Sequence, residues 1–190
     1  MNDRQMRILE SLSSLEILTR TQIQRLHDTK SIRNTNYVMQ SLNRYIDHIR
    51  LQENAYFLNK RGRTLLGVTR QFKYNSHIHH KLMRNDAYVY FRPQKWKNEQ
   101  EVSIGSVTIT PDAYFKTDRF SFLEVDNTQK WHVNEKKIEN YQKFYDTGAF
   151  QRELGYFPEL VWVVKNESRV SKLKHRLGIP HRVIWYNHLR

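Results

Sequence analysis

Three acids that could do chemistry lie in one short stretch of the sequence, TPDAYFKTDRFSFLEVD. This stretch is typical of two short strands around a polar turn. If residues 117–119 form a three-residue turn, Asp112 lies directly opposite Glu124 in the hairpin. Side chains alternate along a strand, so Asp126 shares the face of Glu124. The pattern therefore predicts three carboxylates on one face, whereas a two-residue turn would separate Asp112 from Glu124.

Two carboxylates at this spacing repel each other, and the pKa of one rises unless a cation lies between them. A hard divalent ion with oxygen ligands, Mg²⁺ or Mn²⁺, would suit Asp112 and Glu124 as ligands. Such an ion can activate water for attack on a phosphodiester. The alternative is that the acids form ordinary ion pairs with nearby lysines. Spacing alone favours this alternative, for which three lysines are available: Lys130, Lys136 and Lys137.

The elements that would position these acids extend over residues 75–190. Hydrophobic periodicity predicts the order helix, three strands, helix, strand, helix, strand, which is typical of an α/β domain around one mixed sheet. The end of the first helix is ambiguous, because Tyr88–Phe91 could also begin a strand. Val102–Ile109 alternates as one strand, and PELVWVVKN reads as a buried central strand.

Residues 1–74 predict a different kind of unit. Two short amphipathic helices precede a third that begins after Ser31. The apolar side of this third helix is expected to hold four residues: Val38, Leu42, Tyr45 and Ile46. A hairpin of strands 47–51 and 55–58 and a short closing helix follow. This order is typical of a winged helix-turn-helix, so we expect a DNA-binding domain over residues 1–74 and a second domain over residues 75–190.

The opposite side of the third helix is polar and carries no acid between Ser31 and Tyr45. Long donors and amides in such positions can bind base edges in the major groove or phosphates. The hairpin around Glu53 would then contact the adjacent DNA backbone. Two other interpretations stay open: an ordinary solvated face, or a winged helix that binds protein. The expected DNA-binding residues are Arg33, Asn36, Tyr37, Gln40 and Arg44.

Composition agrees with a polyanionic partner. The formal net charge is +13 and the isoelectric point is about 10.0, which favours double-stranded DNA. The sequence has no cysteine, which excludes a disulfide framework or a cysteine zinc site. No apolar run approaches the ~18 residues that a membrane span needs. We therefore expect a cytoplasmic protein that does not associate with membranes.

The second segment resembles the PD-(D/E)xK nuclease fold, with Pro111-Asp112 and the run LEVD ending at Asp126 in the places of its motif. The whole chain resembles the replication-relaxation family of plasmids and mobile elements, in which such a domain follows a winged helix. The resemblance rests on TPDAYF, FLEVDNTQ and the Lys-rich helix that ends near Tyr141. It implies a role in plasmid replication, DNA relaxation or mobilisation, with replication or relaxase proteins, or a second copy of the chain, as partners.

One departure from the nuclease pattern matters. The PD-(D/E)xK pattern has a lysine two residues after the second acid, where this chain has Asp126. A lysine from the following helix would have to replace it, for which Lys130, Lys136 and Lys137 are candidates, and Gln129 could orient water. Two functions follow: DNA binding with an inactive nuclease-like domain, or a metal-dependent DNA endonuclease or nickase that uses Asp112, Glu124 and Asp126. An adaptor that binds only protein is a third.

Overall fold

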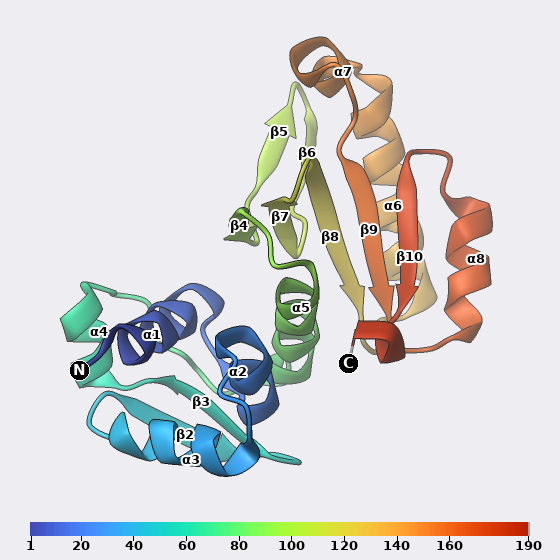
Figure 1. Ribbon diagram of the computed structural model, residues 1–190. Helices are drawn as coiled ribbons and strands as arrows, with labels where there is room; N and C mark the ends of the chain where they lie inside the picture. The colour runs from blue at the N-terminus through green and yellow to red at the C-terminus, as the bar shows by residue number, and fades with distance from the viewer. Residues whose placement is uncertain (190) are drawn as a thin grey trace. The chain divides into compact units, whose positions relative to one another are not determined.

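The computed structural model describes residues 1–189, and the chain divides into two compact units, Met1–Asn85 and Asp86–Arg190. The division falls inside helix α5 (Ile78–Phe91) rather than after Tyr74. Figure 1 shows helices and strands in both units, and a sheet of both parallel and antiparallel strands in the second. The chain is thus a mixed α/β protein. No helix among residues 1–189 is long and apolar enough to cross a membrane.

The first unit contains helices followed by a small sheet. Its helices are α1 (Asp3–Leu15), α2 (Arg20–His27), α3 (Ile32–Ser41) and α4 (Lys60–Leu66). Its strands are β1 (Leu18–Thr19), β2 (Ile46–Arg50) and β3 (Asn54–Leu58), in the order β1-β3-β2 with antiparallel pairing. The predicted helices, hairpin and closing helix of this segment are confirmed.

Local sequence explains where the helices of the first unit begin. The side chains of Asn2, Thr19, Ser31 and Asn59 each accept a hydrogen bond from a backbone N–H in the first turn of the helix that follows. Such caps satisfy N–H groups that have no partner within the helix. The first helix buries Ile8, Leu9, Leu12 and Leu15 at helical spacing.

The third helix is shorter than predicted. It ends at Ser41, and β2 begins at Ile46, so Tyr45 and Ile46 do not lie on it. The buried residues of the helix are Thr35 and Met39, followed by Leu42 at its C-cap. The predicted apolar face was therefore wrong beyond Leu42, because Ile46 is buried as a strand residue.

Gly62 is the one glycine in this unit whose lack of a side chain is required by packing. A Cβ at this position would lie 2.1 Å from the backbone oxygen of Tyr45. Helix α4 can therefore approach the turn before β2 only because residue 62 has no side chain.

The second unit is built on a five-stranded mixed sheet in the order β10-β9-β8-β7-β4. Strands β8, β9 and β10 are parallel, and β7 and β4 are antiparallel to their neighbours. A separate hairpin pairs β5 with β6. The strands are β4 (Lys95–Asn98), β5 (Val102–Ile104), β6 (Val107–Ile109), β7 (Ala113–Lys116), β8 (Phe120–Asp126), β9 (Glu159–Val164) and β10 (His181–Trp185).

Helices cover both faces of this sheet. On one face, α6 (Trp131–Asp146) and α8 (Ser168–Arg176) pack over a core that includes Phe122, Trp162 and Leu173 (Figure 1). The end of α5 lies on the other face, where Phe91 contacts Phe115. The remaining helical elements are α7 (Ala149–Leu154) and the 3-10 turn Tyr186–Leu189.

One prediction for this segment needs correction. Val102–Ile109 is not one strand, because Gly105 adopts a φ of 58° and the chain turns back into the β5–β6 hairpin. Of the two alternatives that the sequence left open for Tyr88–Phe91, the structure has the helix, because these residues continue α5. The sequence did not indicate the edge strand β4 or the short helix α7. The mixed sheet and the other predicted helices and strands are confirmed.

Candidate functional site: an exposed helix face and a buried carboxylate cluster

The exposed side of α3 is the first candidate surface. The helix is fixed from within by a buried contact between the hydroxyls of Thr29 and Thr35 and by the buried side chain of Met39. Four of the predicted residues point away from this buried side and are exposed: Arg33, Asn36, Tyr37 and Gln40. Tyr37 has 71% of its surface exposed, which is unusual for an aromatic residue in the middle of a helix.

Arg44, the fifth predicted residue, lies outside the helix. It is exposed in the turn that follows α3, and its guanidinium carbon is 5.9 Å from the centre of the Tyr45 ring. The spacing of Arg33, Asn36, Tyr37 and Gln40 places them on one helical face, so Arg44 can only extend that face from its end.

Glu53 has a role within the unit. One of its carboxylate oxygens accepts hydrogen bonds from the backbone N–H and the hydroxyl of Thr21, at 3.1 and 2.9 Å, and lies 3.3 Å from Nε of Arg20. The carboxylate therefore holds the β2–β3 hairpin to the start of α2. These bonds also offset the negative charge of the only acid in the hairpin turn.

The second candidate site is the carboxylate cluster on β7 and β8. Ala113 pairs with Leu123 and Lys116 with Phe120, which is the register that the three-residue turn predicts. Asp112, one residue before β7, therefore stands opposite Glu124. Its Oδ2 accepts a hydrogen bond of 2.7 Å from the backbone N–H of Val125. The register prediction is confirmed.

Glu124 is buried, with 2% of its surface exposed. Its Oε2 contacts Nζ of Lys137, and its Oε1 accepts a hydrogen bond of 2.8 Å from the hydroxyl of Tyr141. Burial raises the pKa of Glu124 to about 7; Lys137 opposes the rise, and the nearby carboxylate of Asp112 adds to it. The cluster therefore holds a carboxyl group that can gain or lose a proton near neutral pH.

The two partners of Glu124 lie one helical turn apart on the side of α6 that faces the sheet. Burial alone would lower the pKa of Lys137, but the carboxylates of Glu124 and Asp112 outweigh it and raise that pKa. Burial and Glu124 raise the pKa of Tyr141 well above its usual value. Lys136 is exposed to solvent and forms no ion pair within residues 1–189. Of the three candidate lysines Lys130, Lys136 and Lys137, only Lys137 forms an ion pair with an acid among residues 1–189.

Asp126 has two partners that sequence analysis missed. Its Oδ2 contacts the guanidinium of Arg169 on α8 and accepts a hydrogen bond of 2.7 Å from the side-chain amide of Asn134. Asn134 could have been found, since Asn134, Lys137 and Tyr141 share one face of a helix by their spacing. Nothing in the sequence pattern links Arg169 to Asp126.

Several buried acceptor oxygens lie between the end of β8 and the first residues of α6. Oδ1 of Asp126 and Oδ1 of Asn134 are buried and accept no hydrogen bond from residues 1–189. The same holds for Oδ1 of Asn127 and Oε1 of Gln129. Buried polar atoms are nearly always satisfied by protein, water or a bound group. Because these unsatisfied atoms are all acceptors, they could bind a water molecule or a hard cation.

The donor set can be compared with what a divalent ion requires. Asp112 and Glu124 supply carboxylates on one face, which fits Mg²⁺ or Mn²⁺ in kind. Both oxygens of Glu124, however, have protein donors. Among residues 1–189 no group of three or more acidic or histidine side chains is placed to hold a metal ion.

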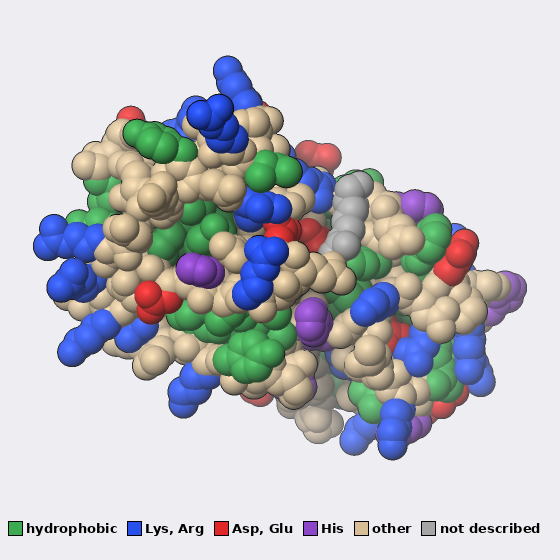
Figure 2. Space-filling view, turned by 90° about the horizontal axis from the view of Figure 1, so that it is seen from below, with side chains coloured by type: hydrophobic (Ala, Val, Ile, Leu, Met, Phe, Trp, Pro, Cys, Tyr) green, Lys and Arg blue, Asp and Glu red, His purple; other side chains and the backbone are tan. Residues whose placement is uncertain are grey.

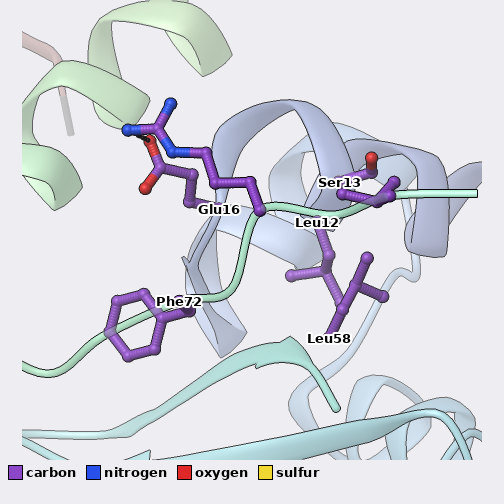
Figure 3. Close-up of a pocket in the computed structure, with 7 residues that line it drawn as sticks. Leu12, Ser13, Glu16, Leu58 and Phe72 are labelled. Carbon is purple, nitrogen blue, oxygen red and sulfur yellow. Dashed lines mark ion pairs between the residues drawn. The ribbon is translucent and has the colours of Figure 1, made fainter. Parts of the chain in front are cut away.

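The first unit also contains a pocket. Leu12, Leu58 and Phe72 give it an apolar lining, and Ser13 and Glu16 add polar groups (Figure 3). The buried carboxylate of Glu16 pairs with Arg70, Lys81 and Arg84 at 3.2, 2.5 and 3.6 Å. These contacts connect α1 to residues that follow α4, so the pocket is explained by packing. None of the site residues that the sequence predicted lines it.

Comparison with known proteins tests the resemblance found in the sequence. The model of a family described as replication-relaxation matches residues 9–160. No curated protein and no solved structure matches the chain. The match covers most of both structural units, including α3 and the hairpin of Asp112 and Glu124. The chain therefore belongs to the replication-relaxation family.

Proposed function

We propose that this protein binds duplex DNA through α3 and acts in the replication, relaxation or mobilisation of a plasmid or other mobile element. One observation carries the proposal: the outward face of α3 has an arginine, two amides and a tyrosine, all exposed, and no acid. Arginine and amide side chains can make paired hydrogen bonds to base edges in the major groove. Membership of the replication-relaxation family supports this role.

The arrangement of the first unit supports a winged helix-turn-helix. Helices α2 and α3 pack against each other, and the β2–β3 hairpin follows α3 directly. In this kind of domain the second helix of the pair enters the major groove. Arg44, in the turn after α3, would then contact the phosphate backbone, and the hairpin would lie beside it.

The proposal is tested by measuring affinity for a labelled duplex. Arg33→Ala and Gln40→Ala are each expected to weaken binding by about 1–3 kcal/mol. Arg4→Ala and Arg7→Ala are matched controls, since both arginines are exposed on α1 in the same unit. Loss in the α3 variants alone supports the proposal. Equal affinity of the α3 variants and the wild type would contradict recognition by α3, and a wild-type chain that binds no duplex would favour an adaptor that binds protein.

A second function is favoured by one contact. Lys137 reaches Glu124 beside Asp112, so the second unit carries two acids and a lysine even though Asp126 stands where the nuclease pattern has its lysine. The alternative is a metal-dependent DNA endonuclease or nickase on a PD-(D/E)xK-like unit. Mg²⁺ or Mn²⁺ held by Asp112 and Glu124 would activate water and neutralise charge on the phosphate, and Lys137 would stabilise the phosphate oxygens.

Nicking of supercoiled DNA in Mg²⁺ or Mn²⁺ tests this second function. Asp112→Asn and Glu124→Gln keep the shape of the side chains and remove the charge. Nicking by the wild type that both variants abolish would support the enzyme. Nicking that survives in both variants would show that Asp112 and Glu124 are not the source of the activity. DNA binding is the principal proposal, because both oxygens of Glu124 already have protein donors.

A further inference from the structure

We propose that the solvent face of α8, with the first residues of α6, is a second nucleic-acid contact surface that binds phosphate groups of the backbone. This α8 surface consists of Lys130, Lys165, Lys172, Lys174 and Arg176. The inference rests on the proposed function only in taking nucleic acid as the ligand. It assigns to the second unit a contact that is independent of α3.

The charge pattern of α8 is the first argument. Leu173 is buried and anchors the helix, while Lys172, Lys174, His175 and Arg176 are exposed. No acid occurs between Ser168 and Arg176. A helix face that is merely solvated usually mixes charges of both signs. A face of one sign is a feature of proteins that bind polyanions.

The α8 surface continues onto the start of α6. Nζ of Lys172 lies 3.7 Å from the centre of the Trp131 ring, a distance at which the cation is attracted by the ring face. Lys130 precedes Trp131 and is exposed, and Lys165 is exposed in the loop before α8. Exposed basic residues from three segments thus lie around the start of α6 and along α8. Figure 2 shows many Lys and Arg side chains, and sparser Asp and Glu, over the face of the molecule that it presents.

Nearby acids offset only part of this charge. Glu135 lies 3.7 Å from Arg176, but the two side chains are 39% and 63% exposed, so the pair is weak in water. Glu167 precedes the helix and Glu139 lies on α6, both exposed. Lys172 and Lys174 form no ion pair within residues 1–189. These two lysines are therefore the clearest phosphate contacts.

The position of the α8 surface gives it a use. Arg169, on the same helix, contacts Asp126 at the carboxyl end of β8, two residues beyond Glu124. The backbone N–H of Lys165 also donates to the backbone oxygen of Asp126, at 3.0 Å. A nucleic-acid strand held by α8 would therefore pass the end of the sheet at which the carboxylate cluster lies.

The test compares two charge reversals in the full chain. Lys172→Glu with Lys174→Glu alters the α8 surface. Lys95→Glu with Lys97→Glu changes the net charge equally on β4, at the opposite edge of the sheet. All four lysines are exposed, so both proteins should fold, which circular dichroism verifies. Affinity is measured against salt concentration with a labelled duplex and with the matching single strand.

We expect the α8 variant to lose about tenfold or more in affinity and about two units of the slope of log affinity against log salt, one for each phosphate contact. The β4 variant should stay within about twofold of the wild type, with an unchanged slope. The nucleic acid that shows the larger loss identifies the form that α8 binds. Equal losses in the two variants, or no loss in the α8 variant, would overturn the inference.

The α3 variants separate this inference from the proposed function. If Arg33→Ala and Gln40→Ala weaken binding and the α8 variant does not, the inference that the α8 surface binds nucleic acid is wrong, and the proposed function stands. If only the α8 variant weakens binding, recognition by α3 is wrong and the inference stands. A wild-type chain that binds neither duplex nor single strand overturns both.

Discussion

Lys137 on α6 contacts the buried carboxylate of Glu124 on β8, although thirteen residues separate them in the sequence. The contact joins the helix to the sheet beside Asp112. In the nuclease pattern that the sequence resembles, a lysine stands two residues after the acid, where this chain has Asp126. The helix supplies a lysine to the same acid from another direction.

Lys137→Met should destabilise the fold at pH 8. The substitution removes the cation that opposes the rise in the pKa of Glu124, so the buried carboxyl must either bind a proton or stay ionised without a partner, and breaking such a buried pair typically costs about 3–5 kcal/mol. Lys136→Met is the matched control, since Lys136 is exposed, and its effect should stay within about 0.5 kcal/mol. Urea unfolding of both variants measures the difference. Equal stability of the two would show that the contact with Glu124 adds nothing to the fold.

The stability of the protein should depend on pH through Glu124. The pKa of this group is 4.5 for the free side chain and about 7 in the fold, so between these values the folded chain binds the extra proton. Stability should therefore fall as pH rises from about 4.5 to about 7. Glu124→Gln cannot titrate and should flatten this part of the profile. A wild-type profile that rises through this range, with the same profile in Glu124→Gln, would contradict the assignment.

Arg169→Met should also be costly. Asp126 is fully buried and would keep only its hydrogen bond from Asn134, so we expect a loss of about 3 kcal/mol in the free energy of unfolding. Arg182→Met is the control, because the pair of Arg182 with Glu159, at 2.9 Å, is 55% and 34% exposed and should contribute at most about 1 kcal/mol. Denaturant titration decides, and a larger loss in the control would count against the role of Arg169.

The sequence predicted the carboxylate cluster because strand geometry leaves few choices. The length of the turn fixes the register, and a period of two then fixes the face, so Asp112 and Glu124 follow from the turn at residues 117–119. Which lysine approaches them could not be predicted. That choice depends on how α6 is rotated against the sheet, which its packing through Tyr141 and Phe144 decides.

Other features were hidden for different physical reasons. Val102–Ile109 alternates on either side of Gly105, but the period shifts by one residue at the turn, a change too small to separate two short strands from one. Leu42 and Ile46 continue the apolar period of α3, but one caps the helix and the other begins β2. Arg169 reaches Asp126 only through the crossover from β9 to β10, a tertiary contact that no local spacing indicates.

Binding of the wild-type chain to a labelled duplex, followed by fluorescence anisotropy over a range of salt concentrations, tests the central claim most directly. We expect saturable binding at low salt, a straight decline of log affinity with log salt, and weaker binding at every salt concentration when Arg33 and Gln40 are both replaced by alanine. Absence of binding at the lowest salt, or identical curves for the wild type and the double variant, would contradict recognition of DNA by α3.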